Sequence, residues 1–221
     1  MSSLSHTPPS VLLVRHGESA SNAGMVTHEP ARIPLTRRGH AQARRFAELL
    51  GAPPARVISS TYTRAIETAQ PVREEHGLAR EFAAVHEFTY LAPARCHGTD
   101  RDDRRPWVEA YWRRCDPLRV DGPGAESFAE FVARVIRFRD AVARGAYSGD
   151  VVFTHGLFMK ALMWLGERRP DLQSRYEMRA FNKFSGENWV PNLGMLRVTA
   201  GTPSRPQLRV KLDLTRVHEI G

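Results

Sequence analysis

The stretch Val11-Leu12-Leu13-Val14-Arg15-His16-Gly17-Glu18 decides the fold, because it joins a short apolar run directly to reactive polar residues. The run Val11–Val14 is wholly aliphatic, which predicts a strand buried inside a sheet that is covered on both faces. Ligands of open α/β sheets bind at the carboxyl ends of the strands. Since Arg15 and His16 directly follow this strand, we expect them to lie at such a site.

Short apolar runs alternate with segments of helical periodicity along the rest of the chain. Further strands are predicted at Arg56–Ser59, Phe82–Val85 and Asp150–Phe153. Apolar residues at helical spacing predict helices over residues 36–50, 62–76, 127–143 and 157–165. Strands that alternate with helices are typical of a mostly parallel sheet with helices on both faces. We therefore expect an α/β fold, a three-layer α/β/α sandwich.

The last part of the chain predicts a β-hairpin. Its strands are Leu193–Thr199 and Leu208–Leu214, joined through Gly201-Thr202-Pro203. Apolar and polar residues alternate along the second strand, which indicates one buried and one solvated face. The strands of a hairpin are antiparallel, so we expect a mixed sheet.

The segment of residues 88–124 differs from its surroundings, because it combines several prolines with clustered charges. We interpret it as a lid-like insertion with one short helix over Pro106–Arg114. No change in composition divides the chain further, and a chain of this length fits one domain. We expect a single domain over residues 1–221, with a core of about residues 10–215.

The 221-residue chain is strongly basic, with a formal net charge of +8. Lysine occurs only at Lys160, Lys183 and Lys211, so nearly all of the basic residues are arginines. Arginine favours bidentate contacts with phosphate or carboxylate, which indicates an anionic partner. No block of five basic residues occurs, and we interpret most arginines as a solvated surface rather than as a nucleic-acid site.

The sequence shows no targeting segment and no cysteine motif. Its first ten residues are polar, and no apolar run approaches the length of a membrane span. Cys96 and Cys115 form neither a disulfide framework nor a zinc motif, and we expect reduced, partly buried thiols. These observations favour a soluble, cytoplasmic protein with no membrane partner.

Two further predicted strands also end in polar groups. Thr154-His155-Gly156 follows the strand Asp150–Phe153, and Ser60 and Arg64 follow the strand Arg56–Ser59. Two histidines and two arginines at neighbouring strand ends predict a phosphate pocket, in which guanidinium groups neutralise charge and one neutral imidazole attacks phosphorus.

The motif Arg15-His16-Gly17-Glu18-Ser19-Ala20-Ser21-Asn22 resembles the signature of the histidine phosphatase superfamily, which includes cofactor-dependent phosphoglycerate mutases. Further resemblances follow in family order at Leu35-Thr36 with Gly39 and Gln42, at Ser59-Ser60 with Arg64, at Gly124 with Glu126 to Phe128 and Arg134, and at Thr154-His155-Gly156. Together they cover about residues 10–200 and imply a phosphoglycerate mutase-like fold.

The resemblance also implies roles for individual residues. His16 would become phosphohistidine, while Arg15, Arg64 and His155 would hold the phosphoryl oxygens. Glu87 would be the proton donor to the leaving oxygen, although its neighbours depart from the commoner family pattern. The resemblance further assigns substrate binding to Asn22, Ser19 and Gly156, and Asn192 is expected at the pocket edge. No metal and no cofactor is expected, because the guanidinium groups supply the positive charge.

The chemistry that follows phosphoryl capture is open to more than one interpretation. The insertion differs from that of dedicated mutases, which favours hydrolysis of a small phosphorylated substrate. The alternatives are a phosphoglycerate-mutase-like transferase, a protein phosphatase, or a non-catalytic protein that binds anions or RNA. In the insertion, Trp107, Tyr111 and Trp112 either stack on the leaving group or pack the lid. Arg95, Arg113 and Arg114 are candidates for steering an anionic substrate.

Overall fold

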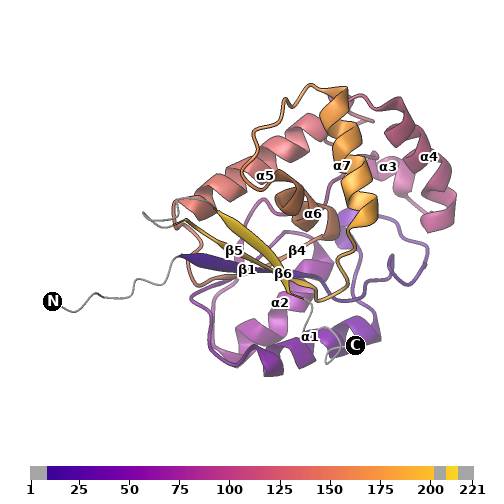
Figure 1. The fold of residues 1–221 in the computed structure, drawn as a ribbon. Helices are drawn as coiled ribbons and strands as arrows, with labels where there is room; N and C mark the ends of the chain where they lie inside the picture. Colours follow the sequence, from indigo (N-terminus) through magenta and orange to yellow (C-terminus); the bar gives the residue numbers. More distant parts are fainter. Residues whose placement is uncertain (1–8, 202–207, 214–221) are drawn as a thin grey trace.

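The structure is a computed structural model, and it describes residues 9–201 and 208–213. Its centre is a six-stranded sheet of order β3-β2-β4-β1-β5-β6 (Figure 1). The strands are β1 (Ser10–Arg15), β2 (Val57–Ser59), β3 (Glu81–Phe82), β4 (Val151–Thr154), β5 (Met195–Thr199) and β6 (Arg209–Asp213). The strands β1 to β4 pair in parallel, whereas β5 is antiparallel to both β1 and β6. The predicted mixed, mostly parallel sheet is confirmed.

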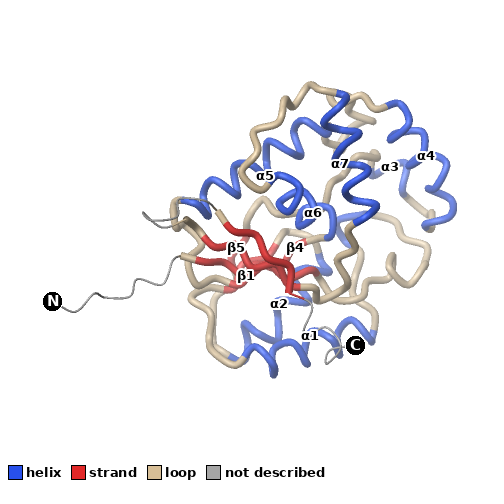
Figure 2. Tube along the Cα trace, viewed as in Figure 1, coloured by secondary structure: helices blue, strands red, loops and turns tan. Residues whose placement is uncertain are grey.

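Helices cover both faces of the sheet, which confirms the three-layer sandwich (Figure 2). The helices α1 (Arg37–Leu50) and α2 (Thr63–Glu75) lie on one face. On the other face lie α5 (Phe128–Ala143), α6 (Gly156–Leu165) and α7 (Arg175–Glu187). None of the helices that the structure describes combines the length and the apolar character that crossing a membrane requires.

The aliphatic run of β1 supplies both halves of the core, because successive side chains of a strand point to opposite faces. Val11 and Leu13 pack with the α5–α7 layer, and Leu12 and Val14 pack with the α1–α2 layer. Val11, Leu13 and Val14 are fully buried. β1 pairs with β4 and β5 on its two sides, so its carboxyl end lies in the middle of the sheet edge.

The insertion packs against the helical layer of α5 and α7. It contains α3 (Pro93–Cys96) and α4 (Arg101–Arg114). Phe88 stacks on Phe131 of α5 at a centroid distance of 4.4 Å, and Trp112 lies 6.2 Å from the ring of Phe181 in α7. The insertion thereby extends the same core and forms one wall above the strand ends.

Two expectations about local structure are wrong, and one helix was missed. The third strand lies at Glu81–Phe82 rather than Phe82–Val85, because the chain leaves the sheet there and Val85 turns into the core. The helix of the insertion begins at Arg101 rather than Pro106, because Asp100 and Asp103 form a capping box. Helix α7 was not predicted at all. Residues 202–207 and Leu214, which belong to the predicted hairpin, lie outside the described residues.

The chain also contains a 3-10 turn at Pro30–Arg32, in the long connection between β1 and α1. This connection crosses the strand ends, and a bridge between Thr27 and Thr99 ties it to the insertion. The two segments together enclose the space above β1.

Candidate active site

The signature loop after β1 is held by close backbone contacts with α1 and α2. A Cβ atom on Gly39 would lie 2.0 Å from the Glu18 carbonyl oxygen, and one on Gly17 would lie 2.8 Å from the Gly39 carbonyl oxygen. Only glycine fits at such distances. The Gly17 N–H donates to Thr68 Oγ1, and the Glu18 N–H donates to Gln42 Oε1. Two helices therefore fix the backbone that carries the predicted nucleophile.

The His16 ring is buried, and its two neighbours determine its tautomer. Nδ1 lies 2.7 Å from the Gly17 carbonyl oxygen, which is solely an acceptor. Arg64 Nε, which is solely a donor, lies 3.1 Å from His16 Nε2. Nδ1 must therefore carry the proton, and Nε2 keeps its lone pair.

Two guanidinium groups flank this ring. Arg64 Nη1 donates to the Pro30 carbonyl oxygen at 2.8 Å, and Arg15 Nη1 donates to the Val190 carbonyl oxygen at 2.6 Å. Both side chains are buried, yet Arg15 Nε has no hydrogen-bond partner among the described residues. A buried donor without a partner is rare, and a bound anion would supply one.

His155 lies behind His16, with ring centroids 5.2 Å apart. Its Nε2 is 2.7 Å from Ser60 Oγ, which itself accepts from the Tyr62 N–H. A hydroxyl oxygen that accepts one hydrogen bond can still donate or accept a second, so Ser60 is a partner for either tautomer of the His155 ring. The Nδ1 atom of this ring is buried and has no partner among the described residues. Together with Arg15 Nε, it is the second buried polar nitrogen at this strand edge without a partner among the described residues.

Burial and neighbouring positive charge keep both histidines neutral. Burial, followed by Arg64 and Arg15, lowers the pKa of His16 well below its usual range. Burial and Arg64 do the same to the pKa of His155. Burial also lowers the pKa of Arg64 to about 10, which leaves it cationic near neutral pH.

Glu87 faces the same space from the opposite side. Its carboxylate accepts from the Leu157 N–H of the first turn of α6, at 3.1 Å, and from the Phe88 N–H, at 3.0 Å. The loop that carries Glu87 is fixed by Arg134 of α5, which donates to the carbonyl oxygens of Ala84 and His86. Glu126 pairs with Arg134 at 2.6 Å. The motif residues Glu126 and Arg134 thus position the predicted acid.

Of the three residues with a predicted substrate-binding role, two line the cavity and one does not. Asn22 and Ser19 line the cavity, and Ser19 Oγ donates to Asn22 Oδ1 at 3.1 Å. Asn192 donates to the His16 carbonyl oxygen and to Asn22 Oδ1, as expected for a residue at the pocket edge. Gly156 starts α6 behind Arg15 and does not line the cavity, and neither does the buried ring of His155.

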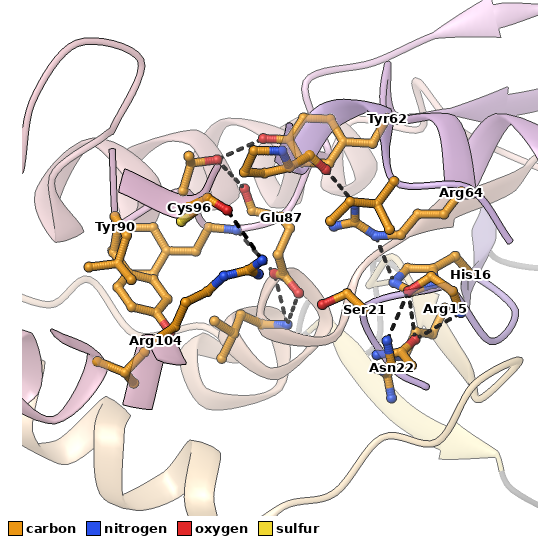
Figure 3. A pocket seen from close by; sticks show the side chains of 18 residues that line it. Arg15, His16, Ser21, Asn22, Tyr62, Arg64, Glu87, Tyr90, Cys96 and Arg104 are labelled. Carbon is orange, nitrogen blue, oxygen red and sulfur yellow. Dashed lines mark hydrogen bonds between the residues drawn. The ribbon is translucent and has the colours of Figure 1, made fainter. Parts of the chain in front are cut away.

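These groups surround a cavity of about 270 Å³. Figure 3 shows Arg15, His16, Asn22 and Arg64 on one side and Tyr90, Cys96 and Arg104 on the other, with Glu87 between them. The far wall is partly apolar, with Phe88, Leu91 and Val108. The cavity is large enough for a phosphoryl group and a small leaving group.

The insertion contributes different residues from those that its sequence suggested. Tyr111 is buried, and Trp112 packs on Phe88, Tyr90 and Phe181, so these rings pack the lid onto the core. Trp107, Arg95, Arg113 and Arg114 line a separate outer cavity.

Arg104 is the arginine of the insertion that faces the catalytic cavity, and sequence reasoning missed it. It donates to Thr27 Oγ1, Thr99 Oγ1 and the Thr99 carbonyl oxygen. Tyr62 was missed as well: its hydroxyl bonds Thr89 Oγ1 at 2.7 Å, and its ring lies beside Arg64 and His155. Neither residue stands out in the sequence as a catalytic type.

Among the described residues, no group of three or more His, Cys, Asp or Glu side chains is arranged to hold a metal ion. Cys96 and Cys115 are both buried and free. Glu18 accepts from Thr36 Oγ1 at the start of α1, so this signature residue holds a helix end rather than facing the cavity.

The fold and the strand-end pocket define a phosphoglycerate mutase-like α/β protein. The family model of the histidine phosphatase superfamily (branch 1) matches residues 11–180, and the chain belongs to this superfamily. No curated protein matches the sequence significantly.

Solved structures of phosphatases share the fold. A mycobacterial glucosyl-3-phosphoglycerate phosphatase has a TM-score of 0.65 at 22% identity, with 93% of this chain and 97% of that chain covered. The α-ribazole phosphatase of Shigella flexneri has a TM-score of 0.67 at 21% identity, covering 92% and 96%. The phosphoserine phosphatase of Entamoeba histolytica, solved with 3-phosphoglyceric acid, has a TM-score of 0.66 at 17% identity, covering 94% and 98%.

Proposed function

We propose that the protein hydrolyses a phosphomonoester through a phosphohistidine intermediate on His16. The observation that carries this proposal is the fixed tautomer of His16. Gly17 holds the proton on Nδ1, so the lone pair of Nε2 is kept beside Arg64 at the cavity. A neutral, oriented imidazole between two cations is the arrangement that attack on a phosphate dianion requires.

The first half-reaction transfers the phosphoryl group to the protein. His16 Nε2 forms a bond to phosphorus while the bond from phosphorus to the leaving oxygen breaks. Glu87, in its protonated form, gives its proton to that oxygen. Arg15 Nε, the Arg64 guanidinium and the His155 Nδ1 proton are donors for the non-bridging oxygens, and Asn22 adds a polar contact.

The second half-reaction regenerates the protein. Water attacks phosphorus, and the bond between phosphorus and Nε2 breaks. The Glu87 carboxylate takes the proton of the attacking water, which restores the acid for the next cycle. The guanidinium groups supply the positive charge throughout, so the proposed reaction uses neither a metal nor a cofactor. We further propose a small phosphorylated substrate and a cytoplasmic location.

Rapid quenching tests the proposed intermediate. Incubation with a ³²P-labelled phosphomonoester should label the protein with phosphate that is labile in acid and stable in base. His16→Ala should abolish both the label and the turnover, whereas Tyr176→Ala, at an exposed position on α7, should change neither. Turnover that survives in His16→Ala would contradict the proposal.

The fate of the phosphoryl group and the need for metal are tested separately. Labelled protein should release inorganic phosphate to water, and preferential transfer to added phosphoglycerate would contradict hydrolysis. A chelator should leave the turnover unchanged. Loss of turnover that a divalent metal restores would contradict metal independence.

A further inference from the structure

A strongly exposed tryptophan lies directly beside the proposed phosphoryl site. Trp189 exposes 69% of its surface, whereas Trp164 is buried in the core. The Trp189 ring centre lies 5.3 Å from Cζ of Arg15, one of the two arginines that flank His16. A single exposed aromatic residue is common on protein surfaces, but its position here requires an explanation.

The loop that carries Trp189 is held rigidly to β1. It spans residues 188–194, between α7 and β5. The Arg15 N–H donates to the Gly194 carbonyl oxygen, and the Leu193 N–H donates to the Arg15 carbonyl oxygen. Arg15 Nη1 also donates to Val190. The backbone on both sides of this loop is therefore tied to Arg15, and the indole of Trp189 lies next to the guanidinium group of the same residue.

Trp189 lines an outer groove into which the catalytic cavity continues. The groove has a volume of about 1070 Å³ and shares Arg15, Asn22, Glu87 and Arg104 with the cavity. This space is far larger than a phosphoryl group needs. A leaving group that extends from the cavity would enter the groove and pass the exposed indole.

The lining of the groove restricts the chemistry of that leaving group. The positive and negative charges of the lining are balanced. The groove is lined by four arginines and four acidic residues, namely Arg15, Arg101, Arg104, Arg105, Glu18, Glu87, Asp100 and Asp102. A second strongly anionic group gains little from such a lining, and a large apolar group would leave these charges without water. Hydroxyl groups both donate and accept, so they suit carboxylates, guanidinium groups and the amides of Asn22 and Asn192.

We propose that Trp189 binds a sugar-like ring in the leaving group of the substrate. The apolar face of the ring stacks on the indole, and its hydroxyl groups bond to the polar lining of the groove. Because Arg15 contacts both the indole and the phosphoryl site, the ring lies within a few bonds of the phosphoester oxygen. This inference rests on the proposed phosphatase function and narrows its substrate class.

Kinetics with three substrates test the proposal. Glucose 1-phosphate carries the ring on the ester oxygen, glycerol 2-phosphate lacks a ring, and 4-nitrophenyl phosphate carries an aromatic ring. Trp189→Ala should raise the KM for glucose 1-phosphate about tenfold with little change in kcat, and it should leave glycerol 2-phosphate unaffected. Trp189→Phe should restore most of the loss. Tyr176→Ala, which removes another exposed aromatic ring, should have no effect.

Three outcomes would overturn the proposal. An equal loss on all three substrates would show that Trp189 only positions Arg15. A loss confined to 4-nitrophenyl phosphate would assign the indole to aromatic leaving groups. Wild-type protein with no preference for glucose 1-phosphate over glycerol 2-phosphate would show that no sugar ring is bound.

A binding measurement separates this proposal from the proposed function. In the His16→Ala variant, glucose 1-phosphate should produce a saturable change in tryptophan fluorescence, and the change should be absent after adding Trp189→Phe. If the wild-type protein hydrolyses no phosphoester but this signal is present, the function fails and the ring site stands. If glycerol 2-phosphate is hydrolysed and the signal is absent, the ring site fails alone.

Discussion

The low pKa of His16 has two opposing effects on a nucleophile. Burial and the flanking arginines lower this pKa, so the lone pair stays available well below neutral pH. The same environment makes the nitrogen a weaker base and hence an intrinsically weaker nucleophile. In the proposed reaction, orientation compensates for this loss, because the arginines that lower the pKa of His16 also neutralise the phosphate dianion as it approaches.

The role of Glu87 is tested by changing the leaving group. Glu87→Gln keeps an acceptor for the Leu157 N–H but removes the proton that the leaving oxygen needs. We expect the rate of phosphoryl transfer to His16, measured in a single turnover, to fall about 10²- to 10⁴-fold for an alkyl phosphate such as glycerol 2-phosphate. The fall for 4-nitrophenyl phosphate should be much smaller, because its phenolate leaves without a proton. Equal losses on both substrates would contradict an acid role.

Sequence reasoning found the residues whose position follows from strand ends. Arg15 ends β1, His16 and His155 directly follow β1 and β4, and parallel strands bring their carboxyl ends to one edge. Arg104 and Trp189 lie in the insertion and in a late loop, where no periodicity relates the sequence to the cavity. Their placement depends on tertiary packing across long sequence separations, which local patterns do not contain.

Whole helices also differ in how well the sequence predicts them. The amphipathic helices α1 and α5 were predictable, because each has a serine or threonine cap and one apolar face. Helix α7 also begins at a serine cap, Ser174, and has one apolar face on which Met178 and Phe181 are buried, so its sequence carries the same signals and sequence reasoning overlooked them. Helix α4 carries Pro106 in its interior, which normally signals a helix start. Tertiary contacts and the Asp100 cap override that signal.

Helix α5 links the core to the catalytic loop through one buried ion pair. Arg134→Met would leave Glu126 without its partner and free the carbonyl oxygens of Ala84 and His86. Breaking a buried pair from one side costs about 3–5 kcal/mol, so we expect a loss of this size in the free energy of unfolding. Urea denaturation measures it.

Arg137→Met is the matched control, because Arg137 lies on the same helix and is exposed. It should change the free energy of unfolding by no more than about 0.5 kcal/mol. A similar loss in both variants would contradict a specific role for the Arg134 pair.

In the molecule as a whole, the arginines that give the net charge of +8 do not all lie on the solvated surface. Arg134 and Arg139 are buried, and each connects separate segments through carbonyl oxygens. Arg15 and Arg64 are also buried, next to two histidines. The interior therefore holds several fixed cations, and burial beside them lowers the pKa of His16, His86 and His155.

This interior predicts that stability falls on mild acidification. Burial lowers the pKa of His16 and His155 in the folded state, and burial and Arg134 lower that of His86 to about 4. Above pH 6.5 these groups are neutral whether the chain is folded or unfolded, so they contribute no pH dependence. Below it, the unfolded chain binds protons that the folded chain does not, at about 1.4 kcal/mol per group and pH unit.

Unfolding midpoints at pH 7, 6 and 5 measure this effect. Acidic groups do not interfere in this window. For example, the Ser127 N–H lowers the pKa of Glu130, so Glu130 loses its contribution to stability only below about pH 4.5. We expect the free energy of unfolding to decrease through this window and His86→Asn to make the decrease shallower. Inorganic phosphate should also flatten it, because an anion beside His155 Nδ1 favours the protonated ring. A stability that stays constant from pH 7 to 5 would show that these rings are not held neutral, and a phosphate-independent slope would show that the anion binds elsewhere.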